Sequence, residues 1–278
     1  MPVTINTIKG SKNKRKIVAL TAYDYSTAKV LDDAGVDIIL VGDSLAQVAL
    51  GYQNTLSITM EEMLHHAKAV LRGVKNSLVV ADMPFLSYQV STKEAMRNAG
   101  KFLQLGAHAV KLEGASRSII RTIEKMNTSG MPVLGHIGFT PQSVNALGGN
   151  RVQGKTAEAA KQLLNQAKDL QNAGCFALVI ELVPSEVAAL ITESLDIPTI
   201  GIGAGADCDG QILVTDDLVG KFTDFKPSFV RRYAEVGKET GNAVRNFIYD
   251  VQNRKYPQIN ESFYLPEIEA ERITEIRK

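Results

Sequence analysis

The chain has little cysteine, almost no net charge and no long hydrophobic run, and each absence excludes a class of protein. Its 278 residues include two cysteines, Cys175 and Cys208, without metal-type spacing, which excludes a disulfide framework and favours a reducing cytoplasm. The formal net charge of +1 provides no broad attraction to nucleic acid or to a membrane surface. No run approaches the ~20 apolar residues of a membrane span. Residues 1–16 are polar and basic, unlike a secretory signal. We therefore expect a soluble cytoplasmic protein without nucleic-acid or membrane partners.

What the chain does contain is a regular alternation of short apolar runs and longer amphipathic stretches. The apolar runs cover residues 17–20, 37–41, 78–81, 108–112, 132–135, 176–180, 197–200 and 211–214. They are apolar throughout rather than alternating, which is typical of parallel strands buried on both faces. We predict an α/β fold in which these strands close into a (βα)₈ TIM barrel, a fold of about 250 residues. A doubly wound open sheet is the alternative.

The composition changes after Gly220. We predict a single domain over residues 1–278, with the barrel proper at about 15–225 and a C-terminal helix and tail at about 226–278. An amphipathic, charged pattern predicts a helix over 229–251, and a Gly/Asn/Gln-rich segment predicts a long loop over 141–154. The tail does not extend the barrel repeat. We expect it to cover the base of the barrel or to pack on a neighbouring subunit.

Three apolar runs deliver an acidic residue at their C-terminal ends, namely Asp43, Asp82 and Glu113. The C-terminal ends of barrel strands meet at one mouth, where active sites lie. Carboxylates so close raise one another's pKa unless a cation neutralises them. Mg²⁺ prefers carboxylates and retained waters. For any one of these acids alone we favour helix capping or a lysine pair, but the three together predict a metal site.

Other candidate side chains at strand ends are Asp24, Ser44, Lys111, His136 and Glu181. A carboxylate at Glu181, against an apolar wall, is either a general base with a raised pKa or part of a structural ion pair. Lys111 lies two residues before Glu113, so both side chains point the same way along a strand. Lys111 therefore holds a substrate carboxylate, neutralises the acids, or forms a Schiff base. His136 either donates a hydrogen bond to substrate or is structural, and Cys208 is either a reactive thiol or inert.

Several segments resemble one known family, that of ketopantoate hydroxymethyltransferase (3-methyl-2-oxobutanoate hydroxymethyltransferase). The matching segments are Thr21–Asp24, Gly42–Leu45, Ala81–Phe85, Lys111–Gly114, Gly135–Gln142, Glu181–Pro184, Gly201–Gly205 and Cys208–Gln211. They occur in the family's order and cover roughly residues 5–250. The departures are Ala46-Gln47, Ala81 and Ala115, where Gly-Met, Val and Gly are usual. They lie beside the site residues and affect the expected substrate preference rather than the chemistry.

The resemblance implies a barrel of the phosphoenolpyruvate/pyruvate-domain type and a transferase of pantothenate biosynthesis. It implies that a hydroxymethyl group passes from 5,10-methylenetetrahydrofolate to 3-methyl-2-oxobutanoate, giving 2-dehydropantoate through an enolate. It implies Mg²⁺ held by Asp43, Asp82 and Glu113, with Glu181 as proton acceptor. The residues expected to contact the 2-oxo acid are Asp43, Ser44, Asp82, Lys111 and His136. The family usually forms a large homo-oligomer, often a decamer. The alternatives are another enzyme of the superfamily that acts on a C–C or P–C bond of a 2-oxo acid, and a non-catalytic oxo-acid-binding barrel.

Overall fold

Eight parallel strands close into a barrel in the computed structural model, which describes residues 2–276. The strands are β1 (Ile17–Thr21), β2 (Ile38–Val41), β3 (Leu78–Asp82), β4 (Ala109–Glu113), β5 (Val133–Gly138), β6 (Ala177–Glu181), β7 (Thr199–Ile202) and β8 (Gly210–Leu213). They are paired in chain order, and β8 returns to β1 with Ile17 opposite Gly210. The closed ring confirms the predicted barrel and excludes the doubly wound open sheet.

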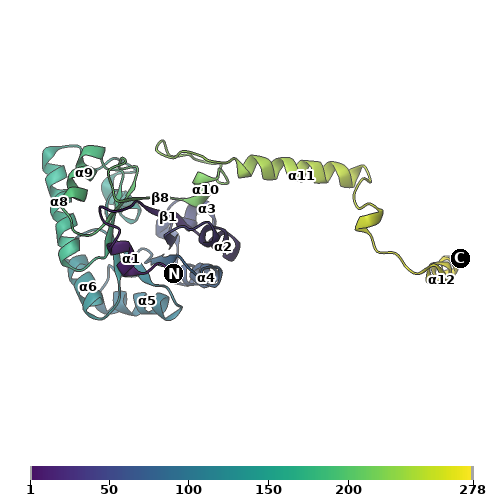
Figure 1. Cartoon of the computed structure of the whole chain (residues 1–278), viewed down its shortest axis with the longest axis horizontal. Coiled ribbons are helices and arrows are strands. Elements are labelled where there is room, and N and C mark those ends of the chain that lie inside the picture. The colour runs from purple at the N-terminus through teal and green to yellow at the C-terminus, as the bar shows by residue number, and fades with distance from the viewer. Residues whose placement is uncertain (1, 277–278) are drawn as a thin grey trace.

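Helices follow most of the strands and surround the barrel (Figure 1). They are α1 (Ile5–Lys9), α2 (Tyr25–Asp33), α3 (Leu45–Val48), α4 (Met60–Gly73), α5 (Thr92–Gln104), α6 (Arg117–Thr128), α7 (Val144–Leu147), α8 (Ala157–Asn172), α9 (Ser185–Glu193), α10 (Thr215–Leu218), α11 (Val236–Gln252) and α12 (Glu267–Ile276). Short 3₁₀ turns are η1 (Thr55–Ser57), η2 (Pro141–Ser143) and η3 (Ile259–Glu261). Local sequence sets several helix starts. The Thr59 hydroxyl, for example, accepts from the Glu62 N–H while the Glu62 carboxylate accepts from the Thr59 N–H, a capping box that begins α4.

The strand side chains form two apolar layers. Because successive residues of a strand point to opposite faces, alternate positions line the barrel interior and the intervening positions meet the helices. Val80 and Ala109 belong to the interior layer, which is buried. Val79 and Val110 belong to the outer layer, where they cluster with helix residues such as Phe102. Both faces of each strand are therefore buried, which explains why the runs are apolar throughout.

Two sequence-based expectations about irregular segments are wrong. The C-terminal helix begins at Val236 rather than at residue 229. The residues just before Val236 are held against the end of α10 instead, because the Tyr233 N–H donates to the Leu218 carbonyl and Val230 is buried. The segment 141–154 is not one long loop, since it contains η2 and α7. Pro141 supplies a backbone angle that suits the first turn of η2.

Helix α11 leads away from the barrel, and α12 lies at the far end of the tail (Figure 1). None of the α11 residues is buried, and Val18 on the outer face of β1 is 50% exposed. The tail therefore does not cover the barrel within its own chain, which contradicts one of the two expectations for it. Between residues 2 and 276 no helix is both long and apolar enough to cross a membrane.

Candidate active site

The polar side chains of the site continue the interior rows of the barrel strands. On β4 the positions that face the barrel interior are Ala109, Lys111 and Glu113. Ala109 belongs to the apolar core, and the next two interior positions along the strand are charged. The same step from the interior layer ends at Asp82 on β3, His136 on β5 and Glu181 on β6. Strand pairing places Asp82 beside Lys111 and Glu113 beside His136. The barrel therefore gathers these residues at the C-terminal mouth, as predicted for a site there.

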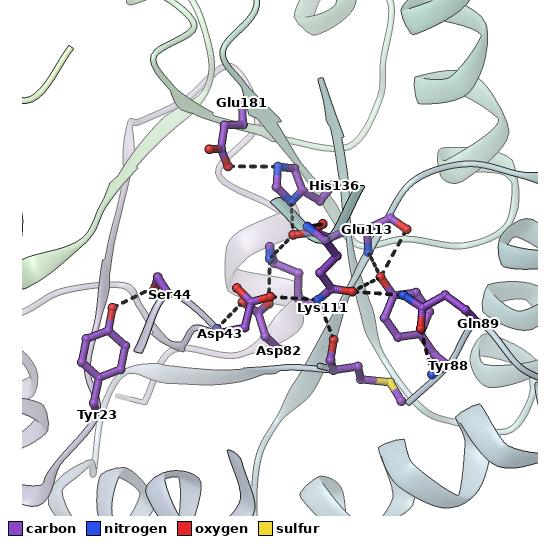
Figure 2. Close-up of polar contacts among 12 residues, drawn as sticks. Tyr23, Asp43, Ser44, Asp82, Tyr88, Gln89, Lys111, Glu113, His136 and Glu181 are labelled. Carbon is purple, nitrogen blue, oxygen red and sulfur yellow. Dashed lines mark hydrogen bonds and ion pairs between the residues drawn. The ribbon is translucent and has the colours of Figure 1, made fainter. Parts of the chain in front are cut away.

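Asp43 and Ser44 enter the same mouth from the turn after β2. The Asp43 N–H donates to Asp82 Oδ2 at 3.0 Å, and the Ser44 hydroxyl lies 2.9 Å from the Tyr23 hydroxyl. Figure 2 shows these contacts at one side of the cluster. A Cβ at Gly42 would lie 2.9 Å from Ser44 Oγ and 3.6 Å from Asp82 Oδ2. Glycine therefore leaves room for the Ser44 hydroxyl and the Asp82 carboxylate beside this turn.

Lys111 is the buried cation of the cluster. Its Nζ donates to Asp82 Oδ1 at 2.7 Å and lies 3.9 Å from Glu113 Oε1, and all three side chains are at least 94% buried. Burial alone would lower the pKa of Lys111, but the charges of Asp82 and Glu113 raise it above its usual value. Lys111 is therefore a permanent ammonium at neutral pH. A Schiff-base role, which needs a neutral amine, is disfavoured.

The acids carry more negative charge than Lys111 neutralises. Burial, followed by the charges of Asp82 and Glu113, raises the pKa of Asp43 well above its usual value. Burial also opposes ionisation of Glu113, but contacts with His136 and Lys111 outweigh it and lower the pKa of Glu113. The two carboxyl groups thus respond in opposite directions, because Glu113 lies beside cations and Asp43 beside anions.

His136 lies between two carboxylates (Figure 2). Its Nδ1 is 3.4 Å from Glu113 Oε1 and its Nε2 is 3.3 Å from Glu181 Oε2. Burial and the charge of Lys111 disfavour the imidazolium, but the two carboxylates outweigh them and raise the pKa of His136 to about 9. Both ring nitrogens face protein groups in this arrangement. Its predicted contact with substrate stays a prediction.

The donor set suits a hard cation. Glu113 Oε1 is buried without a hydrogen-bond partner among the described residues, and Asp43 is crowded by like charges. Within residues 2–276, however, no three His, Cys, Asp or Glu side chains converge closely enough to ligate one ion together. Mg²⁺ usually keeps several waters and takes one or two carboxylates directly. Carboxylates that do not all converge on one point therefore fit a divalent ion that would keep part of its water.

Two other candidates do not join the site chemistry. Asp24 caps α2, where its carboxylate accepts from the Thr27 N–H and hydroxyl. Cys208 is fully buried, and burial raises the pKa of its thiol. A buried thiol with a raised pKa is a poor nucleophile, so the reactive-thiol alternative is not supported.

Three polar residues near the cluster have no role predicted from the sequence: Tyr88, Gln89 and Gln142. The Gln142 amide donates to Asp43 Oδ2 at 2.9 Å, and its backbone N–H donates to Glu113 Oε2 at 3.0 Å. The Tyr88 hydroxyl accepts from the Glu113 N–H. Gln142 ends the segment Gly135–Gln142 that carries the family resemblance, which was the available signal. Tyr88 and Gln89 lie in a loop that has no recognisable pattern.

Comparison with known proteins gives consistent results over nearly the whole chain. The family model described as ketopantoate hydroxymethyltransferase matches residues 2–259. A 3-methyl-2-oxobutanoate hydroxymethyltransferase of Acetivibrio thermocellus is 50% identical, covering 99% of this chain and 97% of the relative. The protein of the same name from Syntrophus aciditrophicus is 52% identical over 94% of this chain and 96% of the relative.

Solved structures with a similar fold are more distant in sequence. Phosphonopyruvate hydrolase in complex with oxalate and Mg²⁺ superposes with a TM-score of 0.61 at 13% identity, covering 99% of this chain and 97% of that chain. A 2,3-dimethylmalate lyase, a member of the PEP mutase/isocitrate lyase superfamily, has a TM-score of 0.59 at 14% identity and covers all of both chains. These similarities show that the chain shares its barrel fold with those enzymes.

Proposed function

The chain belongs to the ketopantoate hydroxymethyltransferase family, and from this we infer that it is the 3-methyl-2-oxobutanoate hydroxymethyltransferase of a pantothenate pathway. The observation that carries the inference is identity of about 50% to proteins of that name over almost the full length of both chains. In the reaction, 3-methyl-2-oxobutanoate receives the one-carbon unit of 5,10-methylenetetrahydrofolate with uptake of water. The products are 2-dehydropantoate and tetrahydrofolate.

Asp43, Asp82 and Glu113 are the residues that would hold a divalent cation, which we propose to be Mg²⁺. Support comes from the excess negative charge of the three acids and from Glu113 Oε1, which is buried and accepts no hydrogen bond from the described residues. Bound there, Mg²⁺ would act as a Lewis acid that polarises the keto group and makes the C3 proton more acidic.

Ser44 and Lys111 are the proposed groups that orient the 2-oxo acid. Ser44 Oγ, held by the Tyr23 hydroxyl, offers a hydrogen bond, and the Lys111 ammonium offers a buried positive charge. As C3 loses its proton, negative charge moves onto the keto oxygen. Lys111 stabilises that charge because its ammonium is already in place and shielded from water, so no reorganisation is needed when the charge develops.

Glu181 is the proposed acceptor of the C3 proton. It ends β6 with its side chain 17% exposed, the most accessible carboxylate among those that follow the interior rows. Its Oε2 lies 3.3 Å from His136 Nε2, and the imidazolium fixes the position of the carboxylate. The carbanionic C3 then attacks the methylene carbon of the folate to form the new C–C bond.

The transfer is tested by product formation with purified protein, Mg²⁺ and both substrates. Product formation that needs methylenetetrahydrofolate separates this activity from C–C or P–C bond cleavage of a 2-oxo acid by the same fold. No turnover of any 2-oxo acid would leave only an oxo-acid-binding barrel. No observation in the structure favours either of those alternatives.

The base is tested by exchange of the C3 proton with solvent deuterium in the absence of folate. Glu181→Gln is expected to slow this exchange by 10²-fold or more, because a positioned base contributes about that factor. Glu186→Gln is a matched control, since Glu186 lies five residues on and is exposed on α9. Wild-type exchange in the Glu181→Gln variant would refute the assignment.

We also propose that the protein is a homo-oligomer in which α11 contributes contacts between subunits. Its exposed apolar residues Val244, Phe247, Ile248 and Val251 follow a helical spacing that places them on one side. Phe247→Glu is expected to lower the mass measured by light scattering. Asn246→Glu is the control, because it introduces the same charge next to the apolar side rather than on it. An equal mass for both variants would exclude α11 as a subunit contact.

A further inference from the structure

Gln142 connects the ends of three other strands to the loop after β5. It lies in η2 and is buried, with 6% of its surface exposed. Its side-chain nitrogen donates to Asp43 Oδ2 and to the Met83 carbonyl, both at 2.9 Å. Its backbone N–H donates to Glu113 Oε2 at 3.0 Å. One residue thus contacts the segments that follow β2 and β3 and the last residue of β4.

The orientation of the Gln142 amide is fixed by its partners. The side-chain nitrogen faces a carboxylate and a backbone carbonyl, and the carbonyl can only accept hydrogen bonds. The amide oxygen accepts from the Tyr88 hydroxyl at 2.8 Å and from Gln89 Nε2 at 3.1 Å. A flipped amide would place its oxygen against the Met83 carbonyl and its nitrogen against the Gln89 amide. The Met83 carbonyl, which can only accept, therefore fixes the observed orientation, and the other three contacts agree with it.

Tyr88 links the amide back to Glu113. Its hydroxyl donates to Gln142 Oε1 and accepts from the Glu113 N–H at 3.1 Å. Burial, followed by the charge of Glu113, raises the pKa of Tyr88, so the hydroxyl keeps its proton. Glu113, Tyr88 and Gln142 thus form a closed ring of hydrogen bonds, in which the backbone N–H groups of Glu113 and Gln142 each supply one link.

We propose that Gln142 is a positioning residue that holds Asp43 and Glu113 in the orientation needed to bind a divalent cation. It engages Oδ2 of Asp43 and Oε2 of Glu113, so the second oxygen of each carboxylate is the one available to the ion. For Glu113 that second oxygen is the buried Oε1, which lies 3.4 Å from His136 Nδ1 and 3.9 Å from Lys111 Nζ but accepts no hydrogen bond from the described residues. The inference deepens the proposed function and rests on its metal site.

Two substitutions at Gln142 remove the donor to Asp43 in different ways. Gln142→Met keeps the volume but removes every side-chain hydrogen bond. Gln142→Glu keeps acceptors for Tyr88 and Gln89, which protects the fold, but opposes a carboxylate to Asp43 Oδ2. Gln171→Met is the matched control, because the Gln171 amide also donates to an aspartate, Asp196, yet lies at the end of α8 away from the mouth.

The measurement is the affinity for Mn²⁺ without substrate, by electron paramagnetic resonance or calorimetry, alongside the melting temperature. We expect both Gln142 variants to bind Mn²⁺ 10–100-fold more weakly than wild type, the usual effect of removing a group that orients a ligand. The control is expected to bind like wild type. Product formation by Gln142→Met should recover in part at high metal concentration, since the ligands are displaced rather than lost.

The possible outcomes distinguish failure of the positioning role of Gln142 from failure of the proposed metal site. Wild-type Mn²⁺ affinity in Gln142→Met would overturn the positioning role while leaving the metal site intact. Tighter binding by Gln142→Glu would also overturn it, because added charge rather than position would then control affinity. No Mn²⁺ binding by wild type would refute the proposed metal site and, with it, this inference.

Discussion

Replacing Lys111 with methionine tests whether the site is held together by compensation of buried charge. Lys111 Nζ lies 2.7 Å from Asp82 Oδ1, and the two side chains are only 6% and 3% exposed. At that separation and an effective dielectric constant of about 20, the direct attraction is roughly 6 kcal/mol. Methionine also relieves the desolvation of the ammonium, so the net cost is smaller. Breaking a buried pair from one side typically costs about 3–5 kcal/mol, which is our expectation for the free energy of unfolding.

The assay is urea unfolding followed by circular dichroism at fixed protein concentration, with and without Mg²⁺. Lys29→Met is the control, because Lys29 forms an ion pair with Asp33 of the same 2.7 Å length whose side chains are 50% and 63% exposed. Exposed pairs contribute little, so we expect no clear change in the control. Mg²⁺ should stabilise Lys111→Met more than wild type, since it supplies the missing positive charge. A loss below about 1 kcal/mol in Lys111→Met without Mg²⁺ would refute the reasoning.

Two further predictions concern Asp32, which binds the segment before β3, and Gly138, which ends β5. Although burial opposes its ionisation, Asp32 has its pKa lowered to about 2 by hydrogen bonds from the segment Lys75–Ser77. A carboxylate whose pKa is lower in the folded state stabilises the fold fully above about pH 4. This stabilisation is lost as the pH falls towards 2. Asp32→Asn should therefore lower the free energy of unfolding by about 1–2 kcal/mol at pH 7, a deficit that disappears near pH 2 in urea titrations; a deficit independent of pH would contradict this. Gly138 has φ +93° and a Cβ there would clash with the Glu181 carbonyl and lie 2.7 Å from Val183 Cγ2. Gly138→Ala should lose more than about 2 kcal/mol of stability and slow C3 exchange by displacing Glu181; wild-type values of both would show that the loop adapts without cost.

The rows of interior side chains were readable from the sequence. A buried parallel strand has a side-chain period of two, so Lys111 and Glu113 had to share one face. A barrel of eight strands brings all the C-terminal strand ends to one mouth. The sequence therefore also predicted that Asp43, Asp82, His136 and Glu181 lie there. The apolar runs carried this information because both faces of a barrel strand are buried.

The contacts among those residues were not readable in the same way. The distance of Lys111 to Asp82, and the position of His136 between two carboxylates, depend on the strand register and on side-chain rotation. Gln142 has no signature of its own, because a polar residue after a proline in a loop is ordinary by composition. Its contacts with Asp43 and Glu113 join segments 99 and 29 residues apart in the chain.

The C-terminal segment illustrates the same division. Its amphipathic pattern correctly indicated a helix, but the start at Val236 depended on hydrogen bonds between Tyr233 and the end of α10. Whether that helix returned to the barrel could not be decided from its pattern, because an apolar side indicates burial without naming the surface that buries it.

The sequence by itself determined the eight strands, the edge of the barrel that collects the acids, and the family. These depend on local periodicity and on residue types at strand ends, which need no knowledge of distant partners. Only the tertiary structure decided which carboxylate lies beside Lys111, which beside His136, and which is held by Gln142. Charges and hydrogen bonds act over a few ångströms, and only the closed barrel brings residues from different strands within that range.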